Sequence, residues 1–399
     1  MPTYVIVGAS LAGAKAAETL RDEGFDGEVV LLGADEERPY ERPPLSKGYL
    51  LGKAERDSVY VHAPDWYADH DVDLRTDVTV TAINRDARTV STASGDLRYD
   101  KLLLTTGASP RRLSFPGSDR AEVLYLRTVA DSDRLRTAFQ PGTRVAVAGA
   151  GWIGLETTAA ARMAGCEVTV IEPQPGALHA QLGPELGAVF TELHRSHGVD
   201  LRFGEVVADF RPGEVVTSSG AHVPADVVIV GIGAAPNDAL AAAAGLEVSG
   251  GILTDAALCT SDPNIFAAGD VANSFNPLLG HPIRVEHWAN ALNGGPAAAR
   301  SMLGQPVVYD RVPYFFSDQY DLGMECAGLP SPGAYDQVVY RGDRDALEFV
   351  ALWLSRGVVI AGMNVNVWDV NSDIQSLIRS ARPVDPARLS DPAIPLADA

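Results

Sequence analysis

The stretch Val145-Ala146-Val147-Ala148-Gly149-Ala150-Gly151-Trp152-Ile153-Gly154 decides the fold of this chain. Its small and β-branched apolar residues predict a buried strand, and its three glycines predict a tight turn into a helix. In such a turn Gly149 bends the chain, Gly151 lets backbone approach a pyrophosphate, and Gly154 lets the helix pack on the strand. The pattern therefore predicts a βαβ unit that binds a dinucleotide.

A second apolar strand, Val168-Thr169-Val170-Ile171, ends on Glu172. An acid at this place binds the 2′-hydroxyl of a ribose and repels a 2′-phosphate, so we expect NADH rather than NADPH here. A further buried strand closes the region on Gly231-Ile232-Gly233. The candidate residues for the nicotinamide nucleotide are Gly149, Gly151, Trp152, Ile153, Gly154, Glu172, Gly231, Ile232 and Gly233.

The same unit occurs earlier, over residues 3–32, with the turn Gly8-Ala9-Ser10-Leu11-Ala12-Gly13. Ser10 stands in place of the second glycine and is small enough to be tolerated. The acid after the second strand is displaced, so Asp35 becomes the candidate for the ribose hydroxyls, with a solvated loop carboxylate as the alternative. The candidates at this turn are Gly8, Ser10, Leu11, Ala12, Gly13 and Asp35.

Two such units on 399 residues and 42.2 kDa predict an α/β protein with two Rossmann-like domains, because one core would be too small for the chain. Aromatic strands after Val312 and a short helix near Asp373–Arg379 predict an additional C-terminal α+β domain. We expect an FAD-binding domain over 1–111 and 246–312, a NAD-binding domain over 112–245, and the α+β domain over 313–399. The end of the chain, rich in Pro, Asp and Ala, predicts a partly frayed tail.

Charge and cysteine content limit the function. The net charge of −20 disfavours nucleic acid as a partner. Cys166, Cys259 and Cys326 form no CxxC pair, so we expect neither a redox dithiol nor a metal site. No apolar run has membrane-spanning length and the chain enters a strand at once, so we expect a cytoplasmic protein without membrane contact. With two dinucleotides and no dithiol, hydride transfer from a nicotinamide to a flavin is the simplest chemistry.

Several ordered motifs resemble one family along the whole chain. They are Pro43-Pro44-Leu45-Ser46-Lys47, Leu126-Arg127-Thr128, Gly149 to Glu156, Gly231-Ile232-Gly233 with Pro236-Asn237, Ala268-Gly269-Asp270, Val285-Glu286-His287-Trp288 and Phe316-Ser317-Asp318-Gln319-Tyr320. Together they resemble the FAD-dependent NAD(P)H:ferredoxin reductases of the putidaredoxin reductase and rubredoxin reductase type. Members of that family serve cytochrome P450 and ring-hydroxylating oxygenase systems.

The resemblance implies FAD, NADH and a small iron–sulfur ferredoxin as partner, with a P450 or oxygenase further along. It implies that Lys47 and Glu156 pair beside the flavin where the nicotinamide stacks, and that the helix opening near Trp288 directs its dipole at the flavin. Family members often have a tryptophan where this chain has Phe316. Further candidates for the flavin site are Arg42, Lys47, Val80, Thr106, Gly107, Arg127, Gly269, Asp270, Glu286, His287 and Trp288.

Two other functions stay open at this level. An NADH oxidase, peroxidase or disulfide reductase would need a reactive cysteine near the flavin. A redox-sensing flavoprotein of the apoptosis-inducing-factor type would bind partners instead of turning over. For the ferredoxin, either a local cationic face or an apolar contact is required, and the basic candidates are Arg311, Arg341, Arg344, Arg379 and Arg382.

Overall fold

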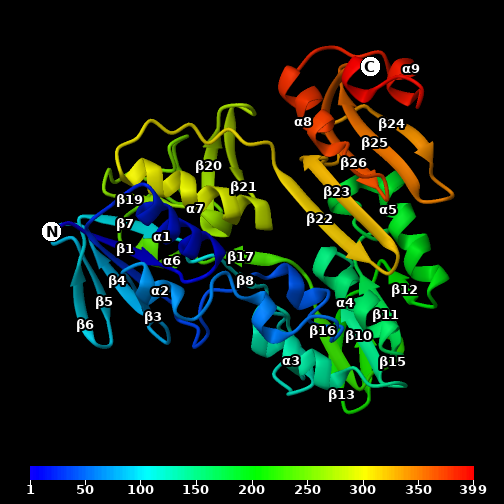
Figure 1. Cartoon of the computed structure of the whole chain (residues 1–399). Helices are drawn as coiled ribbons and strands as arrows, with labels where there is room; N and C mark the ends of the chain where they lie inside the picture. The colour runs from blue at the N-terminus through cyan, green and yellow to red at the C-terminus, as the bar shows by residue number, and fades with distance from the viewer. The chain divides into compact units, whose positions relative to one another are not determined.

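The computed structural model describes all residues, 1–399. Its packing divides the chain into two compact units. Unit 1 comprises Met1–Arg42, Arg56–Ser109 and Ala234–Pro313, and unit 2 comprises Pro43–Glu55, Pro110–Gly233 and Tyr314–Ala399. The predicted α/β class is confirmed, because each unit is built around a parallel sheet (Figure 1). The boundaries expected for the three domains stay a prediction.

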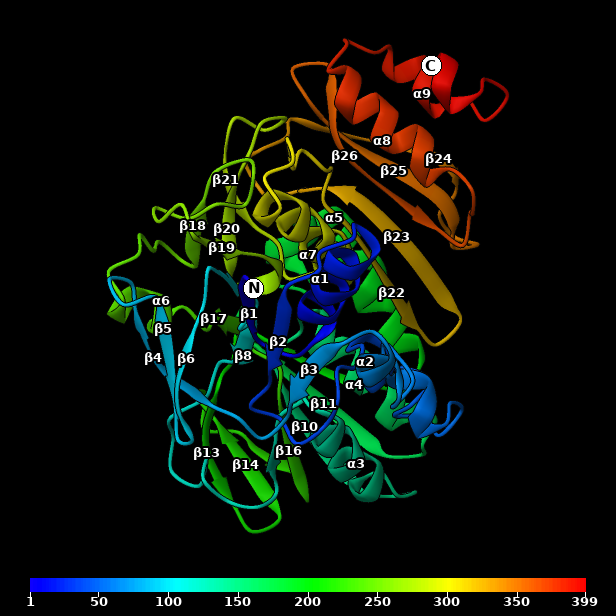
Figure 2. The same cartoon turned by 60° about the vertical axis from the view of Figure 1, so that its left-hand side comes forward.

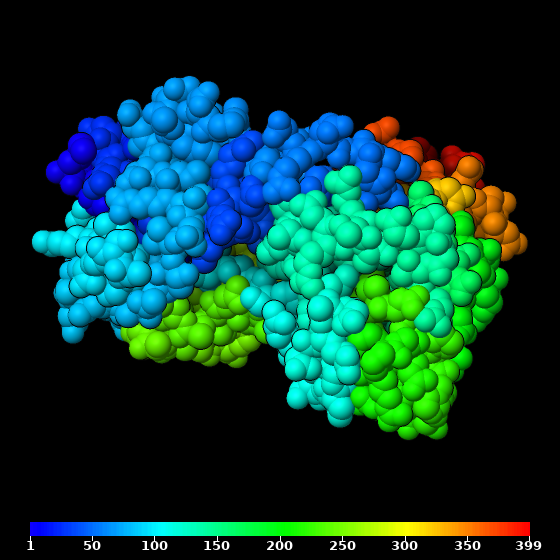
Figure 3. Space-filling model, turned by 90° about the horizontal axis from the view of Figure 1, so that it is seen from below, coloured from blue at the N-terminus to red at the C-terminus, as the bar shows by residue number.

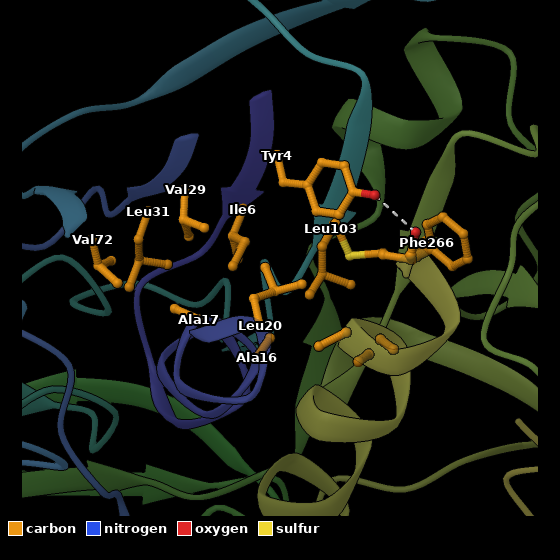
Figure 4. Packing of buried hydrophobic residues seen from close by; sticks show 14 of the residues in the cluster. Tyr4, Ile6, Ala16, Ala17, Leu20, Val29, Leu31, Val72, Leu103 and Phe266 are labelled. Carbon is orange, nitrogen blue, oxygen red and sulfur yellow. Dashed lines mark hydrogen bonds between the residues drawn. The ribbon is translucent and has the colours of Figure 1, made fainter. Parts of the chain in front are cut away.

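The central sheet of unit 1 is parallel, with the strand order β19-β7-β1-β2-β3. One of its faces carries α1 and α7, and Figure 4 shows Ile6 and Leu103 of the sheet beside Leu20 of α1, with Leu31 nearer to Ala17. The Tyr4 hydroxyl donates to the Met302 carbonyl at 3.0 Å and ties the sheet to the end of α7. The elements are β1 Thr3–Val7, α1 Leu11–Asp22, β2 Glu28–Leu32, β3 Val72–Arg75, β7 Lys101–Leu104, β19 Ile265–Ala267 and α7 Trp288–Met302.

The opposite face of this sheet packs on a small antiparallel sheet and a short helix. The alternate residues Val5, Val30 and Leu102 contact Val90 of β5 and Ala241 of α6 in one buried cluster. Unit 1 therefore has three layers, with the strand ends of the central sheet left for a ligand. Its other elements are η2 Arg56–Val59, α2 Trp66–Asp69, β4 Val80–Asn84, β5 Thr89–Thr92, β6 Gly95–Arg98, β8 Ala108–Pro110, β17 Ala234–Pro236, α6 Ala239–Ala243, β18 Ile252–Thr254, η3 Gly269–Val271, β20 Ala272–Asn276 and β21 His281–Arg284.

Unit 2 repeats the parallel sheet in the order β12-β11-β10-β16-β9. The first two strands of each βαβ unit pair in the same register, Val7 with Leu32 and Ala148 with Ile171. The backbone hydrogen bond that follows is also repeated, from Gly8 N to Leu32 O at 2.8 Å and from Gly149 N to Ile171 O at 2.9 Å. The predicted duplication of a Rossmann-like unit is thus confirmed. The elements are β9 Val123–Leu124, β10 Arg144–Ala148, α4 Trp152–Met163, β11 Glu167–Glu172, α5 His179–Ser196, β12 Asp200–Phe203 and β16 Val227–Val230.

A three-stranded antiparallel sheet lies beside this parallel sheet. Its Phe210 N–H donates to Pro116 O at 3.0 Å, so that the segment near residue 116 is held against β13. Figure 3 shows the surfaces of these two segments adjoining, the first cyan and the second green. The three strands of this sheet are β13 Val207–Arg211, β14 Glu214–Thr217 and β15 His222–Pro224. Unit 2 also contains η1 Pro43–Ser46 and α3 Val129–Ala138.

The C-terminal part of unit 2 is an antiparallel sheet, β22-β23-β26-β25-β24, with α8 packed against its middle strands (Figure 2). The expected frayed tail is wrong: Leu389, Leu396 and Ala399 are buried. Arg341 donates to the carbonyls of Asp391, Pro392 and Ile394, and Arg382 donates to those of Ala397 and Ala399. The elements are β22 Tyr314–Gln319, β23 Leu322–Gly328, β24 Gln337–Asp343, β25 Glu348–Ser355, β26 Val358–Val365, α8 Asn371–Ser380, α9 Pro386–Ser390 and η4 Leu396–Asp398.

None of the helices combines the length and the apolar character needed to cross a bilayer. The cytoplasmic location expected from the sequence stays a prediction.

Candidate functional site

The first glycine turn, in unit 1, is closed by contacts with the strand end at Thr105. Gly8 has φ +119°, and a Cβ there would lie 2.1 Å from Thr105 O. A Cβ on Gly13 would lie 2.2 Å from Gly8 O. These two glycines are therefore required by the packing of the protein itself. Ser10 is extended at the N-cap of α1 and makes no side-chain cap hydrogen bond, so the first amides of the helix are left for an anionic ligand.

The acid predicted for this turn is engaged in its own loop. Asp35 Oδ2 accepts from the Tyr40 hydroxyl at 2.7 Å, and Oδ1 accepts from Glu37 N–H at 3.2 Å. The position directly after β2 is Gly33, where a Cβ would lie 2.6 Å from the Cβ of Ala9. This close approach explains why no acid follows the strand directly. The role of Asp35 at a ribose stays a prediction.

The glycines of the second turn, in unit 2, are needed for two different reasons. A Cβ on Gly149, which has φ +104°, would lie 2.5 Å from Gly231 O, and one on Gly154 would lie 2.1 Å from Gly149 O. At Gly151 the nearest protein atom to an added Cβ is Gln181 Nε2, at 3.8 Å. The protein thus needs the outer glycines for packing, whereas a Cβ on Gly151 would make only ordinary van der Waals contacts with the protein. The missing side chain there fits the close approach of a pyrophosphate.

Glu172 lies at the end of β11, beside the second turn. Its Oε2 accepts from Ala150 N–H at 2.7 Å and its Oε1 accepts from Gln174 N–H at 2.8 Å. A carboxylate has about four lone-pair sites, so two remain for ribose hydroxyls. The side chain therefore braces the turn and keeps acceptor capacity, and its role at a ribose 2′-hydroxyl stays a prediction.

Lys47 and Glu156 form an ion pair within unit 2. Lys47 Nζ lies 2.7 Å from Glu156 Oε2, and the two side chains are 15% and 4% exposed. Ser46 Oγ also donates to Oε2, and Ser317 Oγ donates to Oε1 at 2.7 Å. Both oxygens of the buried carboxylate are thus satisfied, which a buried charge requires. The three donors come from η1, from the residue that follows it, and from β22.

Two further side chains surround this pair. Lys47 Nζ lies 5.5 Å from the centre of the Phe316 ring, so the ring contributes a cation–π contact. Desolvation raises the pKa of the Asp318 carboxyl; Lys47 opposes this shift and Glu156 adds to it. The predicted pairing of Lys47 with Glu156 is present in the structure, and its part in catalysis stays a prediction.

The other candidates for flavin binding are residues of unit 1, except Arg127, which belongs to unit 2. In unit 1, Thr106 Oγ1 donates to Asn237 O at 2.8 Å, and Gly107 O accepts from Asn237 N–H at 2.9 Å. Both residues therefore hold their segment against the one at Asn237. Arg42 lies 5.5 Å from the Tyr40 ring, and Val80 begins β4. Gly269 and Asp270 lie on η3, Leu11 and Ala12 are buried at the start of α1, and His287 is the N-cap of α7, between Glu286 and Trp288. Arg127, in unit 2, precedes the capping box of α3.

The start of α4 in unit 2 carries the remaining nucleotide candidates. The Trp152 ring makes edge contacts with Phe190 of α5 and Phe315 of β22, at 5.5 and 4.9 Å. Ile153 is 42% exposed, and Ile232 is partly buried against the core. Gly233 has φ +95°. Trp152 therefore fixes the turn, while Ile153 is open to a ligand.

Sequence reasoning missed three residues at these places. Ser46 and Ser317 donate to Glu156, although both belong to motifs that the sequence pointed out. Thr105 Oγ1 donates to Gly8 O at 2.8 Å and locks the first turn. Its signal was the Thr-Thr-Gly sequence at a strand end, which we had assigned to Thr106 and Gly107 alone.

The three cysteines are free. Burial raises the pKa of all three thiols, Cys166, Cys259 and Cys326, and Cys326 is fully buried. A reactive redox cysteine requires the opposite, a lowered pKa with access to solvent. No group of three or more His, Cys, Asp or Glu side chains is arranged to hold a metal ion.

Comparison with known proteins gives the family. Residues 2–295 match the family described as pyridine nucleotide-disulphide oxidoreductase, and residues 314–399 match the one described as reductase C-terminal. The chain belongs to the pyridine nucleotide-disulphide oxidoreductase family. It is therefore an oxidoreductase that uses a flavin and a nicotinamide nucleotide.

The relatives give the particular branch. The ferredoxin–NAD(+) reductase component of the anthranilate 1,2-dioxygenase system from Burkholderia cepacia is 40% identical, with 98% of each chain covered. Putidaredoxin reductase of Pseudomonas putida is 37% identical over 98% of this chain and 95% of its own. The crystal structure of the covalent putidaredoxin reductase–putidaredoxin complex has a TM-score of 0.95 at 37% identity, covering 99% and 97% of the two chains. The ferredoxin reductase for the CYP199A2 system from Rhodopseudomonas palustris also has a TM-score of 0.95, at 34% identity over all of both chains.

These findings confirm the resemblance to the ferredoxin reductases. The alternative of an oxidase or peroxidase is not favoured: a water-forming NADPH oxidase is 22% identical, with a TM-score of 0.88, and so shares the fold alone. The redox-sensing alternative is likewise not favoured, since both relatives are named as reductases and one of them is a component of a dioxygenase system.

Proposed function

We propose that this chain is an NADH-dependent ferredoxin reductase: it takes a hydride from NADH onto FAD and passes the electrons singly to a small iron–sulfur ferredoxin. The ferredoxin then serves a cytochrome P450 or a ring-hydroxylating oxygenase. The observation that carries the proposal is the duplicated glycine turn. In each copy two glycines pack directly on backbone oxygens, and the helix that follows begins without a side-chain cap on its first amides. The relatives that act with ferredoxins support the acceptor.

In this proposal each unit has one nucleotide to hold. The turn at Gly8 and the residues of η3 would bind FAD, while the turn at Gly149 and Glu172 would bind NADH. A bound flavin supplies the conversion of a two-electron donor into single electrons. The α7 helix is 15 residues long, and its N-terminal dipole, at Trp288, would favour negative charge placed there.

The hydrogen bonds of the Lys47–Glu156 pair indicate what each residue can do. Glu156 accepts hydrogen bonds on both of its oxygens, and Lys47 Nζ directs one N–H at Oε2, 2.7 Å away. Two N–H bonds of the ammonium then remain for an acceptor at the reaction centre. We propose that Lys47 is the catalytic cation at hydride transfer and that Glu156 holds it in place.

A spectrum and a coupled assay test the function. The purified protein should be yellow, release FAD on denaturation, and bleach on addition of NADH under argon. Reduction of cytochrome c should then depend on an added small iron–sulfur protein. Colourless protein that takes up no flavin, or full cytochrome c reduction without any ferredoxin, would contradict the proposal.

A cysteine-free variant distinguishes the oxidase alternative. Cys166→Ala, Cys259→Ser and Cys326→Ala combined should keep the NADH-dependent reduction of ferredoxin, since Cys166 and Cys326 are buried, Cys259 is partly buried, and all three thiols have raised pKa values. Loss of flavin reduction in a variant that still binds FAD would favour a thiol mechanism.

A further inference from the structure

A chain of hydrogen bonds leads from Glu156 to a buried histidine that no motif singled out. Glu156 Oε1 accepts from Ser317 Oγ at 2.7 Å, and Ser317 Oγ accepts from Gln319 Nε2 at 3.2 Å. Gln319 Oε1 lies 2.8 Å from His194 Nε2, and His194 Nδ1 lies 3.2 Å from the Tyr320 hydroxyl. All of these side chains belong to unit 2.

The chain follows from the geometry of three elements. Ser317 and Gln319 are two residues apart on β22, so they point to the same face, and both are only 1% exposed. That face meets α4, which carries Glu156, and α5, which carries the fully buried His194. Tyr320 forms the tight turn after β22 with φ +57°.

The carboxylate fixes the direction of every bond in this chain. An ionised Glu156 can only accept, so Ser317 must donate to it and must accept from the Gln319 amide NH₂. The amide oxygen of Gln319 therefore faces His194, and the imidazole must carry its proton on Nε2. His194 Nδ1 then accepts from the Tyr320 hydroxyl. Every donor of the chain points toward Glu156.

We propose that His194 is a positioning residue: through Gln319 and Ser317 it holds the Glu156 carboxylate aligned against Lys47. The proposal rests on the function given above for the Lys47–Glu156 pair. A buried imidazole nitrogen without a hydrogen-bond partner costs free energy. Both nitrogens of His194 have partners in this chain. Burial lowers the pKa of His194 to about 4, which keeps the ring neutral at the pH of turnover.

Other titratable groups around the two ends are few. Lys47, directly after η1, pairs with Glu156, and Asp318 of β22 feels both charges: Lys47 lowers the pKa of the Asp318 carboxyl and Glu156 raises it. His197 stacks on the Tyr320 ring at 3.7 Å, and Arg162 acts on Tyr320 through its charge. His197 lies outside the hydrogen-bond chain, since its Nδ1 contacts Leu193 O at 2.8 Å. It therefore serves as the matched control.

Substitution of the imidazole tests the role through a pH profile. His194→Leu removes the Nε2 donor, whereas His194→Gln can offer an amide N–H at a similar place. We measure the rate of flavin bleaching by NADH in a single turnover between pH 5.5 and pH 9, values chosen to span the neutral range about the ordinary histidine pKa. In His194→Leu the acid limb should move up by about one pH unit, a roughly tenfold slower rate at the acid end with recovery at alkaline pH. His194→Gln and His197→Phe should keep the wild-type profile.

A spectroscopic measurement on the resting protein is independent of turnover. With ¹⁵N-labelled histidine, the His194 signals, assigned by their loss in His194→Gln, should show the Nε2–H tautomer at neutral pH. The Nδ1–H tautomer would overturn the proposal, because the chain would then run away from Glu156. Identical pH profiles in His194→Leu and wild type would overturn it as well.

Two further comparisons keep the outcomes distinct. If wild-type flavin is not bleached by NADH, the proposed function itself fails, whatever the His194 tautomer. If His194→Leu does not fold, Ser317→Ala and Ser317→Thr replace it: the hydroxyl-free variant should show the shifted profile and the threonine variant should not. Equal profiles for that pair would overturn the inference.

Discussion

At the scale of single residues, a carboxylate can be kept charged inside a protein only if each oxygen finds donors. Glu156, 4% exposed, receives Lys47 and Ser46 on one oxygen and Ser317 on the other. Glu172 instead receives two backbone amides and keeps free lone pairs. The two acids therefore suit different tasks, one holding a cation in place and the other binding a ligand.

Replacement of Glu172 tests the preference for NADH. In Glu172→Ala the anion that repels a 2′-phosphate is gone, so the ratio of kcat/KM for NADPH over NADH should rise roughly tenfold to a hundredfold. Steady-state kinetics with both nucleotides measure this ratio. Glu167→Ala, at the other end of β11, is the matched control and should leave the ratio unchanged. A wild-type protein that prefers NADPH would contradict our interpretation of Glu172.

The buried His194 also predicts a dependence of stability on pH. Its pKa is about 4 in the folded chain and 6.5 when unfolded, so between these values the unfolded state binds more protons. Stability is therefore lost as the pH falls from about 6.5 toward 4. Between pH 7 and pH 5 the free energy of unfolding should fall by ~2 kcal/mol more in wild type than in His194→Gln. Urea unfolding at both pH values measures this difference, and the exposed His281→Gln variant should behave as wild type.

At the scale of elements, each glycine turn joins a strand to a helix so closely that backbone meets backbone. Gly154 approaches Gly149 O, and Gly13 approaches Gly8 O in the first copy, at nearly the same calculated separation. Gly151 and Ser10 occupy the middle position, which has no such contact at Gly151. The turn thus has two separate requirements. Its outer glycines allow helix and strand to approach, and a small residue in the middle leaves room for a proposed phosphate.

Two alanine substitutions separate these requirements. Gly151→Ala has room on the protein side, so its unfolding temperature should stay close to wild type while the dissociation constant for NADH rises roughly tenfold. Gly154→Ala forces a Cβ onto Gly149 O, so we expect a loss of about 1–3 kcal/mol of stability. Thermal unfolding and NADH titration of both variants check this. Equal destabilisation by the two changes would show that Gly151 is needed for packing rather than for the nucleotide.

At the scale of the whole molecule, sequence patterns predicted the helices and strands well, but they did not predict the long-range contacts between side chains. Glycine turns between apolar runs are local signals, so both βαβ units and the C-terminal sheet and helix could be predicted. The environment of Glu156 could not, because its partner Ser46 is 110 positions away and Ser317 is 161 positions away. The frayed tail was wrong for the same reason: Arg341 lies about 50 positions before the carbonyls it binds.

The charge of the whole molecule decides how a ferredoxin can dock. Of the five candidate arginines, Arg341 and Arg382 are used to hold the C-terminal tail, and Arg344 lies over the Tyr340 ring at 4.1 Å. These three therefore do not form a free cationic face. With a net charge of −20, the reductase should repel an acidic ferredoxin at long range, so we expect the contact to be mainly apolar.

Salt should therefore assist the encounter. The Debye length falls from about 30 Å at 0.01 M salt to about 8 Å at 0.15 M, so added salt screens the repulsion between two acidic proteins. We expect kcat/KM for an acidic ferredoxin to rise roughly threefold over this range, because screening removes repulsion and leaves the apolar contact in place. Reduction of an uncharged quinone, measured at the same NADH concentration, is the control for salt effects on the earlier steps. A steep fall of kcat/KM with salt would instead require a cationic docking face, and charge reversal at Arg311 and Arg379 would then identify it.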